Sequence, residues 1–312
     1  MRIVIPDDAP AVLGPSEAYR GLLERTPVEY HATLPGSEER LVERIRDADI
    51  VINIRSSSKF PASVLEACPK MKLLSLWGTG TDNVDLAAAR RLGVRVTNTP
   101  GVAAVSIGEH CLMLMLAVAR RVIVMDRETR HGKWPRGQMV ELNGKTLGVI
   151  GLGAIGRQFA RLGRAIGMRV ITWTMNPKPE LGFEHVELDE IYSTSDVVSL
   201  HLRLSPETEG FVGAQAFGRM KPSAIFINTA RGPIVDEAAL IEALQSGRLA
   251  GAGLDVFERE PLPAGHPLSE MDSVILSPHC AGVTPETLEK GLQMAVDNVW
   301  KFLDGKPEHV VV

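Results

Sequence analysis

The clearest structural signal in this 312-residue chain is the stretch Lys145-Thr-Leu-Gly-Val-Ile-Gly151-Leu-Gly153-Ala-Ile-Gly156-Arg-Gln-Phe-Ala160. An apolar strand pattern leads into three glycines spaced G-x-G-x-x-G, and these open a helical pattern. In this setting Gly151 makes a tight turn, Gly153 lets a pyrophosphate approach the backbone, and Gly156 lets the helix pack on the strand. The N-terminus of the helix offers unpaired N–H groups and the positive end of its dipole to the phosphates. We therefore predict a dinucleotide-binding loop rather than a glycine-rich turn without a ligand.

One part of the dinucleotide pattern is missing from the second strand. An acidic residue about 20 positions after the loop normally binds the ribose hydroxyls, but Thr174 occupies that place. Without a carboxylate a 2′-phosphate is no longer repelled, and Asn176 or Lys178 could contact one. No arginine stands in this loop, however, and Thr174 could instead bind the ribose of NAD more weakly. Both NAD(H) and NADP(H) therefore stay open as the cofactor.

Short aliphatic runs alternate with helical patterns along almost the whole chain. Continuous apolar strands separated by helices are typical of parallel sheets buried on both faces. Right-handed crossovers then give doubly wound α/β architecture. Strands are expected at 2–5, 50–54, 73–76, 94–98, 146–150, 169–173, 197–200, 224–228, 251–256 and 273–276.

The pattern of strands predicts two domains. Residues 105–130 have helical periodicity without a strand, which indicates a connecting helix between two sheets. A last helix near 285–303 follows the final strand, and we expect it to pack on the first domain. Residues 1–99 plus 285–312 would then form one discontinuous domain, and residues 100–284 the dinucleotide-binding domain.

Composition argues against several other classes of protein. The chain has 34 Lys and Arg against 38 Asp and Glu, a net charge of −4, so no basic surface for nucleic acid or anionic membrane is evident. Its three cysteines show neither metal-ligand nor disulfide spacing, and no metal is predicted. The N-terminus begins with a strand pattern rather than a signal peptide, and charges interrupt the most apolar stretch. We expect a cytoplasmic protein.

Three polar residues follow three successive strands of the second domain. They are Arg231, Glu260 and His279, in Asn-Thr-Ala-Arg231-Gly, Phe-Glu-Arg-Glu260-Pro and Ser-Pro-His279-Cys. Ligands of doubly wound sheets bind at the carboxyl ends of the strands, so all three loops can reach one crevice. Each residue alone could be an ion pair, a solvated acid or a loop histidine, but together they indicate a site.

Along essentially its whole length the chain resembles the D-isomer-specific 2-hydroxyacid dehydrogenase family. The motifs that carry the resemblance occur in the family's order: Asn83-Val-Asp85, Asn98-Thr-Pro-Gly101, Glu109-His110, the glycine loop, Arg231, Glu260 and His279. The resemblance implies a flavodoxin-like substrate (cap) domain and a Rossmann nicotinamide domain. It also implies a homodimer formed through the nicotinamide domain.

The chemistry of these three side chains suits a 2-keto acid. The rigid fork of Arg231 can bind the carboxylate and polarise the carbonyl. Hydride from the nicotinamide reaches the carbonyl carbon, so the oxygen needs a proton, and His279 is the expected donor. Glu260 beside it would favour the imidazolium and raise the pKa of the histidine.

The resemblance also assigns further contacts to residues of this chain. His201, Leu202 and Arg203 would border the adenosine, although the family usually has proline where Arg203 stands. Asp255 would accept a hydrogen bond from the carboxamide. The full cofactor set is Gly151, Gly153, Ala154, Ile155, Gly156, Thr174, His201, Leu202, Arg203, Ala230, Arg231, Asp255, His279 and Gly282. The substrate set is Arg55, Trp77, Gly78, Thr79 and Arg231, where ordinary surface and core roles are equally open for Arg55 and Trp77.

Other branches of the superfamily fit less well. The formate-specific branch has glutamine in place of Glu260, and the phosphite-oxidising branch has lysine in place of Thr79. We expect a short 2-keto acid such as glyoxylate or hydroxypyruvate. The alternative is an NAD(H)-sensing interaction protein like the transcriptional corepressors of this fold, which retain the Arg–Glu–His set; turnover separates the two.

Overall fold

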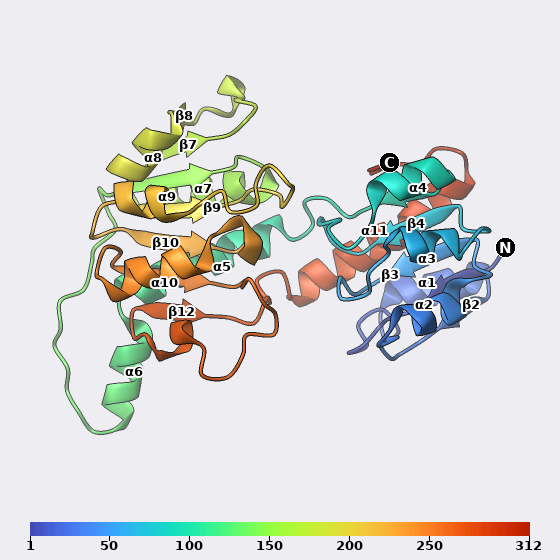
Figure 1. The fold of residues 1–312 in the computed structure, drawn as a ribbon, viewed down its shortest axis with the longest axis horizontal. Coiled ribbons are helices and arrows are strands. Elements are labelled where there is room, and N and C mark those ends of the chain that lie inside the picture. Colours follow the sequence, from blue (N-terminus) through green and yellow to red (C-terminus); the bar gives the residue numbers. More distant parts are fainter. The chain divides into compact units, whose positions relative to one another are not determined.

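The computed structural model describes residues 1–312 and divides into two compact units (Figure 1). The first consists of residues 1–103 and 283–312, and the second of residues 104–282. Each contains one parallel sheet with helices on both faces. The predicted fold class, two doubly wound α/β domains, is confirmed.

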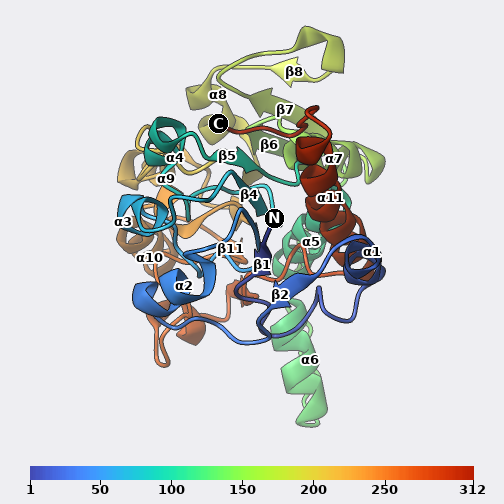
Figure 2. The ribbon, with the colours of Figure 1, turned by 90° about the vertical axis from the view of Figure 1, so that its right-hand side faces the viewer.

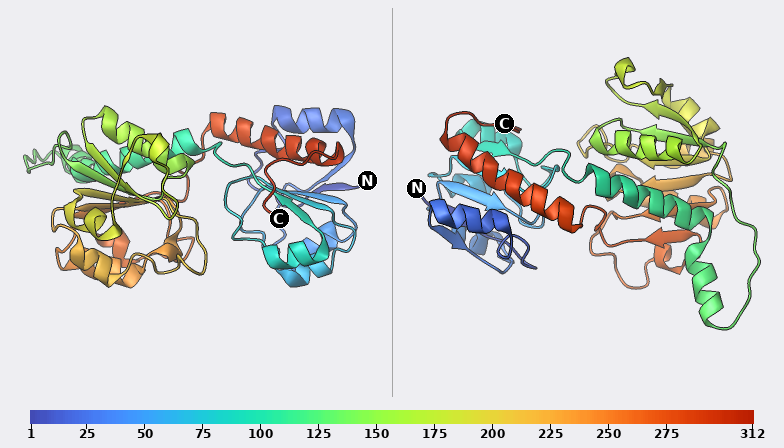
Figure 3. Two further views of the ribbon diagram at one scale, coloured as in Figure 1. Left: turned by 90° about the horizontal axis from the view of Figure 1, so that it is seen from above. Right: turned by 180° about the vertical axis from the view of Figure 1, so that it is seen from behind.

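The first unit has five strands in the order β2-β1-β3-β4-β5, which is the flavodoxin-like order. Helices α1 and α11 cover one face of its sheet, and α2, α3 and α4 cover the other (Figures 2 and 3). Aliphatic side chains from the sheet and from α11 form one of its two cores. The elements are β1 (Ile3–Ile5), α1 (Glu17–Arg25), β2 (Val28–Tyr30), α2 (Glu38–Ile45), β3 (Ile50–Asn53), α3 (Ala62–Glu66), β4 (Leu73–Leu76), α4 (Leu86–Leu92), β5 (Arg95–Thr97) and α11 (Pro285–Leu303).

The second unit has seven strands in the order β12-β11-β10-β9-β6-β7-β8. The order reverses between β6 and β9, and at such a switch point the carboxyl ends of the strands open into a ligand crevice. Helices α5 and α7 cover one face of the sheet, and α8, α9 and α10 cover the other. The elements are α5 (Ala104–Ala119), α6 (Val122–Arg130), β6 (Thr146–Ile150), α7 (Ala154–Ala165), β7 (Arg169–Trp173), β8 (Glu184–His185), α8 (Leu188–Thr194), β9 (Val197–Leu200), α9 (Ala214–Arg219), β10 (Ile225–Asn228), α10 (Glu237–Gln245), β11 (Gly251–Leu254) and β12 (Val274–Leu276), with short 3-10 helices at Pro179–Leu181, Gly232–Ile234 and Pro267–Glu270.

The single helix expected at 105–130 is wrong, because the structure has two helices there. The break falls at Arg121, whose φ of 50° is left-handed. Most of α5 is apolar and packs on the sheet, whereas Val124 is the one buried residue of α6. The chain therefore leaves the core at this point and continues as an exposed helix. None of the helices has the length and apolarity needed to cross a membrane.

Two strands, β2 and β8, were not predicted. Both lie at an edge of their sheet. The residues of β2 are half-buried and those of β8 are exposed, so neither carries the continuous apolar run by which the inner strands were found.

Candidate active site

The glycine loop has the backbone that its sequence predicts. Gly151 adopts a φ of 96°, and a Cβ added there would lie 2.5 Å from the carbonyl oxygen of His201. A Cβ added at Gly156 would lie 2.0 Å from the carbonyl oxygen of Gly151, so α7 approaches the strand as closely as glycine allows. These two positions require glycine for packing alone.

The middle glycine of the loop, Gly153, faces open space. A Cβ added at Gly153 would meet nothing within 4 Å. Gly153 is also the N-cap of α7, and no side chain caps that helix. The first N–H groups of α7, including those of Ala154 and Ile155, therefore have no side-chain acceptor. An open backbone at an uncapped helix N-terminus fits the pyrophosphate of a dinucleotide.

The ends of the neighbouring strands carry the residues expected beside the adenosine. Thr174 directly follows β7 and is half-buried, while Asn176 and Lys178 are exposed. His201 directly follows β9, its Nε2 lies 2.9 Å from Ser199 Oγ, and desolvation lowers its pKa well below the usual range. The imidazole of His201 is therefore neutral near pH 7 and offers no positive charge to a phosphate.

Glu260 and His279 form a direct hydrogen bond. His279 Nδ1 lies 2.7 Å from Glu260 Oε2, and Glu260 Oε1 accepts from the N–H of Phe257 at 3.1 Å. Burial alone would raise the pKa of Glu260, but the hydrogen bond from His279 and the charge of Arg231 outweigh it, and the pKa is lowered. Because the carboxylate can only accept, Nδ1 carries the hydrogen, and Nε2 is the ring nitrogen left to exchange a proton.

The backbone of His279 is left-handed, with a φ of 51°. The buried Asp255 holds this turn: its carbonyl oxygen accepts the N–H of His279 at 2.8 Å. Its carboxylate accepts the next two N–H groups, from Cys280 at 3.0 Å and from Ala281 at 2.9 Å. Gly282 follows directly. The fixed turn directs the imidazole toward Glu260.

Arg231 lies on a loop that packs against the loop of Glu260. A Cβ added at Gly232 would lie 1.9 Å from the carbonyl group of Phe257, so the two loops touch through their backbones. Asn228 shapes the Arg231 loop by accepting from the N–H of Ala230 at 2.9 Å and donating to the carbonyl of Arg231 at 3.1 Å. The positive charge of Arg231 is thereby held near the Glu260 carboxylate.

A pocket of about 590 Å³ opens at the Glu260–His279 pair. It lies at the carboxyl ends of β11 and β12, and its walls beside the pair are mostly apolar. The lining residues are Phe257, Glu260, Pro261, Leu262, Leu276, Ser277, Pro278 and His279. An apolar pocket with a few convergent polar groups is the usual form of a small-molecule site.

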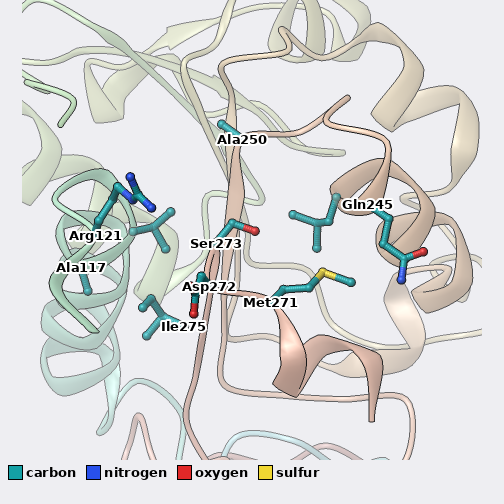
Figure 4. Close-up of a pocket in the computed structure, with 10 residues that line it drawn as sticks. Ala117, Arg121, Gln245, Ala250, Met271, Asp272, Ser273 and Ile275 are labelled. Atoms are coloured by element: carbon teal, nitrogen blue, oxygen red, sulfur yellow. The ribbon is translucent and has the colours of Figure 1, made fainter. Parts of the chain in front are cut away.

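A second pocket of the same unit contains none of the predicted site residues (Figure 4). Ala117 of α5 and Arg121, which lies between α5 and α6, face Ser273 and Ile275 across it. Ser273 precedes β12, so this pocket lies at the amino end of a strand whose carboxyl end leads to His279. Its position makes it a poorer candidate for the reaction site.

The predicted substrate residues of the first unit follow strands β3 and β4. Arg55 donates through Nη2 to the carbonyl of Pro10, and its guanidinium carbon lies 6.0 Å from the centre of the Trp77 ring. The N–H of Gly78 donates to Thr99 Oγ1 at 2.8 Å, and Thr79 Oγ1 donates to the carbonyl of Thr99. Gly78 was predicted to contact the substrate, and its N–H has a partner within the first unit.

Two polar residues at the site were not assigned a role from the sequence. His110 Nε2 lies 2.8 Å from Ser277 Oγ, and Ser277 Oγ lies 2.6 Å from Asp255 Oδ1. The Glu109-His110 motif carries part of the family resemblance, but His110 and Ser277 are 167 residues apart in the sequence. No local pattern could have paired them.

Comparisons with known proteins identify the family. The model for the D-isomer specific 2-hydroxyacid dehydrogenase NAD-binding domain matches residues 112–281. A glyoxylate reductase from Aeropyrum pernix is 40% identical over 285 residues, which cover 87% of this chain and 85% of that protein. A glycerate dehydrogenase from Methylorubrum extorquens is 38% identical over 295 residues, 91% of each protein. The solved structure of an acyclic imino acid reductase with NADPH and D-arginine has a TM-score of 0.92 and 30% identity, and the match covers 100% of both chains.

The fold and the site thus define an NAD(P)-dependent oxidoreductase. The chain belongs to the D-isomer specific 2-hydroxyacid dehydrogenase family, which confirms the resemblance drawn from its motifs. It is a D-2-hydroxyacid dehydrogenase, or 2-keto acid reductase, that uses a nicotinamide cofactor.

Proposed function

We propose that this enzyme reduces a short 2-keto acid, such as glyoxylate or hydroxypyruvate, with Arg231, Glu260 and His279 as its catalytic residues. The observation that carries the proposal is the 2.7 Å hydrogen bond between His279 and Glu260 at the mouth of an apolar pocket. Two of the relatives described above are a glyoxylate reductase and a glycerate dehydrogenase, which supports a short substrate.

The three side chains have different tasks in this proposal. Arg231 binds the carboxylate of the substrate with its fork of donors and polarises the keto oxygen. The bound nicotinamide supplies the hydride. His279 gives the proton on Nε2 to the keto oxygen, so that the C=O group becomes a hydroxyl, and the same nitrogen accepts the proton in the reverse direction. Glu260 holds the tautomer by accepting from Nδ1.

The proposed cofactor residues are the glycine loop and the residues that follow β7, β9, β10, β11 and β12. In particular, Asp255 and Gly282 would lie beside the nicotinamide, and Thr174 beside the adenosine ribose. Because Thr174 neither repels a 2′-phosphate nor binds two ribose hydroxyls, we propose that NADH and NADPH are both used. The test compares kcat/KM for the two cofactors in wild type and in Thr174→Asp. The variant should favour NADH, and a hundredfold preference for NADH in wild type would contradict the proposal.

The first unit is proposed to bind the substrate through Arg55, Trp77, Gly78 and Thr79. The side chain of Trp77 also packs against Gly291 of α11, where an added Cβ would lie 2.5 Å from the indole nitrogen. Trp77 therefore has a core role in addition to any contact with substrate.

We propose a homodimer formed through the second unit. Val105, Met113 and Leu116 recur at helical spacing along one exposed face of α5. Helix α6 and the segment after it project from the sheet of this unit (Figures 1 and 3) and expose Ile123 and Trp134, the latter 76% accessible. A second copy of the chain would cover these side chains. Light scattering should give twice the chain mass, and Ile123→Asp should lower it.

The cytoplasm is the proposed location of the enzyme, since the structure contains three free cysteines, of which Cys68 and Cys111 are buried. Cell fractionation would test this.

The deciding experiment measures turnover. Purified protein is mixed with NADH or NADPH and a panel of short 2-keto acids, and loss of nicotinamide absorbance is followed. We expect reduction of glyoxylate or hydroxypyruvate. Binding of NADH without turnover of any keto acid would contradict the enzyme and favour the alternative, an NAD(H)-sensing protein like the corepressors of this fold.

A further inference from the structure

A hydrogen-bonded chain connects helix α5 with the loop of His279. His110 Nε2 lies 2.8 Å from Ser277 Oγ, which lies 2.6 Å from Asp255 Oδ1. His110 Nε2 is itself 3.6 Å from Asp255 Oδ1. His110 and Ser277 are partly buried, and Asp255 is almost fully buried. None of these contacts is needed to form a strand or a helix.

The direction of the chain follows from the donors and acceptors available. A carboxylate only accepts, so the short bond requires the hydroxyl of Ser277 to donate to Asp255. The carbonyl of Leu254, at 3.4 Å, is a poorer acceptor for that hydroxyl. The Ser277 oxygen is then the acceptor for His110, which must carry a hydrogen on Nε2. The order is His110 to Ser277 to Asp255.

Asp255 connects these hydrogen bonds to the turn at His279. Its Oδ1, which accepts from Ser277, also accepts from the N–H of Cys280 at 3.0 Å. Its carbonyl oxygen accepts the N–H of His279, whose left-handed φ of 51° is uncommon for a residue with a side chain. Such a conformation persists where the surroundings fix it. A carboxylate free to rotate would loosen the turn that directs His279 toward Glu260.

We propose that His110 is a positioning residue. Acting through Ser277, it fixes the rotamer of the Asp255 carboxylate and thereby the left-handed turn at His279. The inference rests on the proposed role of His279 in proton transfer.

The kinetic test compares three variants of the hydrogen-bonded residues His110 and Ser277 with a matched control variant. His110→Leu and Ser277→Ala should each lower kcat by about 10- to 100-fold, because a small misplacement of a reacting group costs that much. His110→Gln keeps an N–H donor near the position of Nε2 and should restore kcat to within roughly threefold of wild type. His185→Leu, at an exposed histidine of β8, should leave kcat unchanged. Normal kcat in folded His110→Leu would overturn the proposal, and so would failure of His110→Gln to rescue.

Two measurements do not depend on turnover. Nitrogen NMR of the imidazole should show hydrogen on Nε2 of His110 in wild type, and a bare Nε2 would overturn the inferred order. Crystal structures of wild type and His110→Leu should differ in the His279–Glu260 bond, which is 2.7 Å here; an unchanged bond and turn would overturn the positioning role. EDTA is kept in all samples, because ligand atoms of His110, Asp255 and Cys280 lie within 4.8 Å of one another and could chelate a metal ion. If wild type reduces no keto acid, the proposed function fails, while these two measurements still decide the role of His110.

Discussion

Asp7 in the first unit and Asp255 in the second hold a neighbouring loop in the same way, but the two loops differ in what they support. Each is a buried aspartate that follows a strand and whose carboxylate holds a neighbouring loop by two consecutive backbone N–H groups. For Asp7 these groups belong to Ile54 at 2.9 Å and Arg55 at 3.2 Å. Asn53 also donates to Asp7 through its side-chain amide.

The hydrogen bonds around Asp255 lead outward to the residues proposed for proton transfer. It holds the turn of His279, and His279 bonds the partly exposed Glu260 beside a pocket. Around Asp7 the polar contacts close within the protein, since Asn53 in turn accepts from the buried Asn83 at 3.0 Å. In the proposed function, the same arrangement of a buried carboxylate serves proton transfer in the Asp255 loop, and binding or folding in the Asp7 loop. We therefore expect changes near Asp255 to affect kcat, and changes near Asp7 to affect KM and stability.

The largest effect is expected from His279→Gln. The variant cannot exchange a proton at the position of Nε2, so kcat should fall by about 10²–10⁴-fold. The dissociation constant of NADH, measured by fluorescence, should change little, because the variant alters only one of the proposed cofactor residues and leaves the glycine loop untouched. A near-normal kcat would contradict the proposed role of His279. It would also contradict the view that the Asp255 loop serves proton transfer.

The next largest effect is expected from Asp255→Asn, with Asp7→Asn as its matched control. The amide keeps the shape of the side chain but replaces one acceptor oxygen with a donor, which faces an N–H group that it cannot satisfy. Asp255→Asn should lower kcat by about 10- to 100-fold through misplacement of His279. Asp7→Asn should leave kcat within about threefold of wild type. Equal losses of kcat in the two variants would contradict the distinction drawn here.

Features of the fold could be predicted from the sequence where only one type of residue fits the local structure. Gly151 and Gly156 were predictable because only glycine fits their close backbone contacts, and the inner strands because they are buried on both faces. The break at Arg121 was not predictable, since the helical pattern runs through it and only the loss of contact with the sheet ends the helix.

The sequence suggests the residues of the candidate site but not the hydrogen bonds that connect them. Arg231, Glu260 and His279 stand out because each follows a strand of one sheet. The link from His110 to Ser277 and the internal partner of the Gly78 N–H depend on side-chain rotamers and on contacts between distant segments. Periodicity and spacing carry no information on either.

A smaller effect is expected from Arg55→Lys, which tests the loop that Asp7 holds. Lysine keeps the charge but loses the planar fork that can bind a carboxylate with two hydrogen bonds. The KM for the keto acid should rise by about tenfold, with kcat within about twofold of wild type. A fall in kcat without a change in KM would show that this loop takes part in the chemistry. The proposed difference between the Asp7 and Asp255 loops would then be wrong.

The smallest effect concerns stability and pH in Asp7→Asn. Burial raises the pKa of Asp7 above its ordinary value of 3.8, and backbone hydrogen bonds from Ile54 and Arg55 only partly offset this. Between the two pKa values the folded protein binds more protons than the unfolded chain, so the stability that Asp7 contributes is full below pH 3.8 and is lost as the pH rises through the raised pKa. Asn does not titrate. Urea unfolding should therefore show wild type gaining stability relative to Asp7→Asn as the pH is lowered from neutral toward 4, with each tenfold weaker acidity of folded Asp7 contributing about 1.4 kcal/mol. A difference that is constant with pH would mean that burial does not govern the titration of Asp7, and a difference of opposite sign would mean that the hydrogen bonds to its carboxylate outweigh burial.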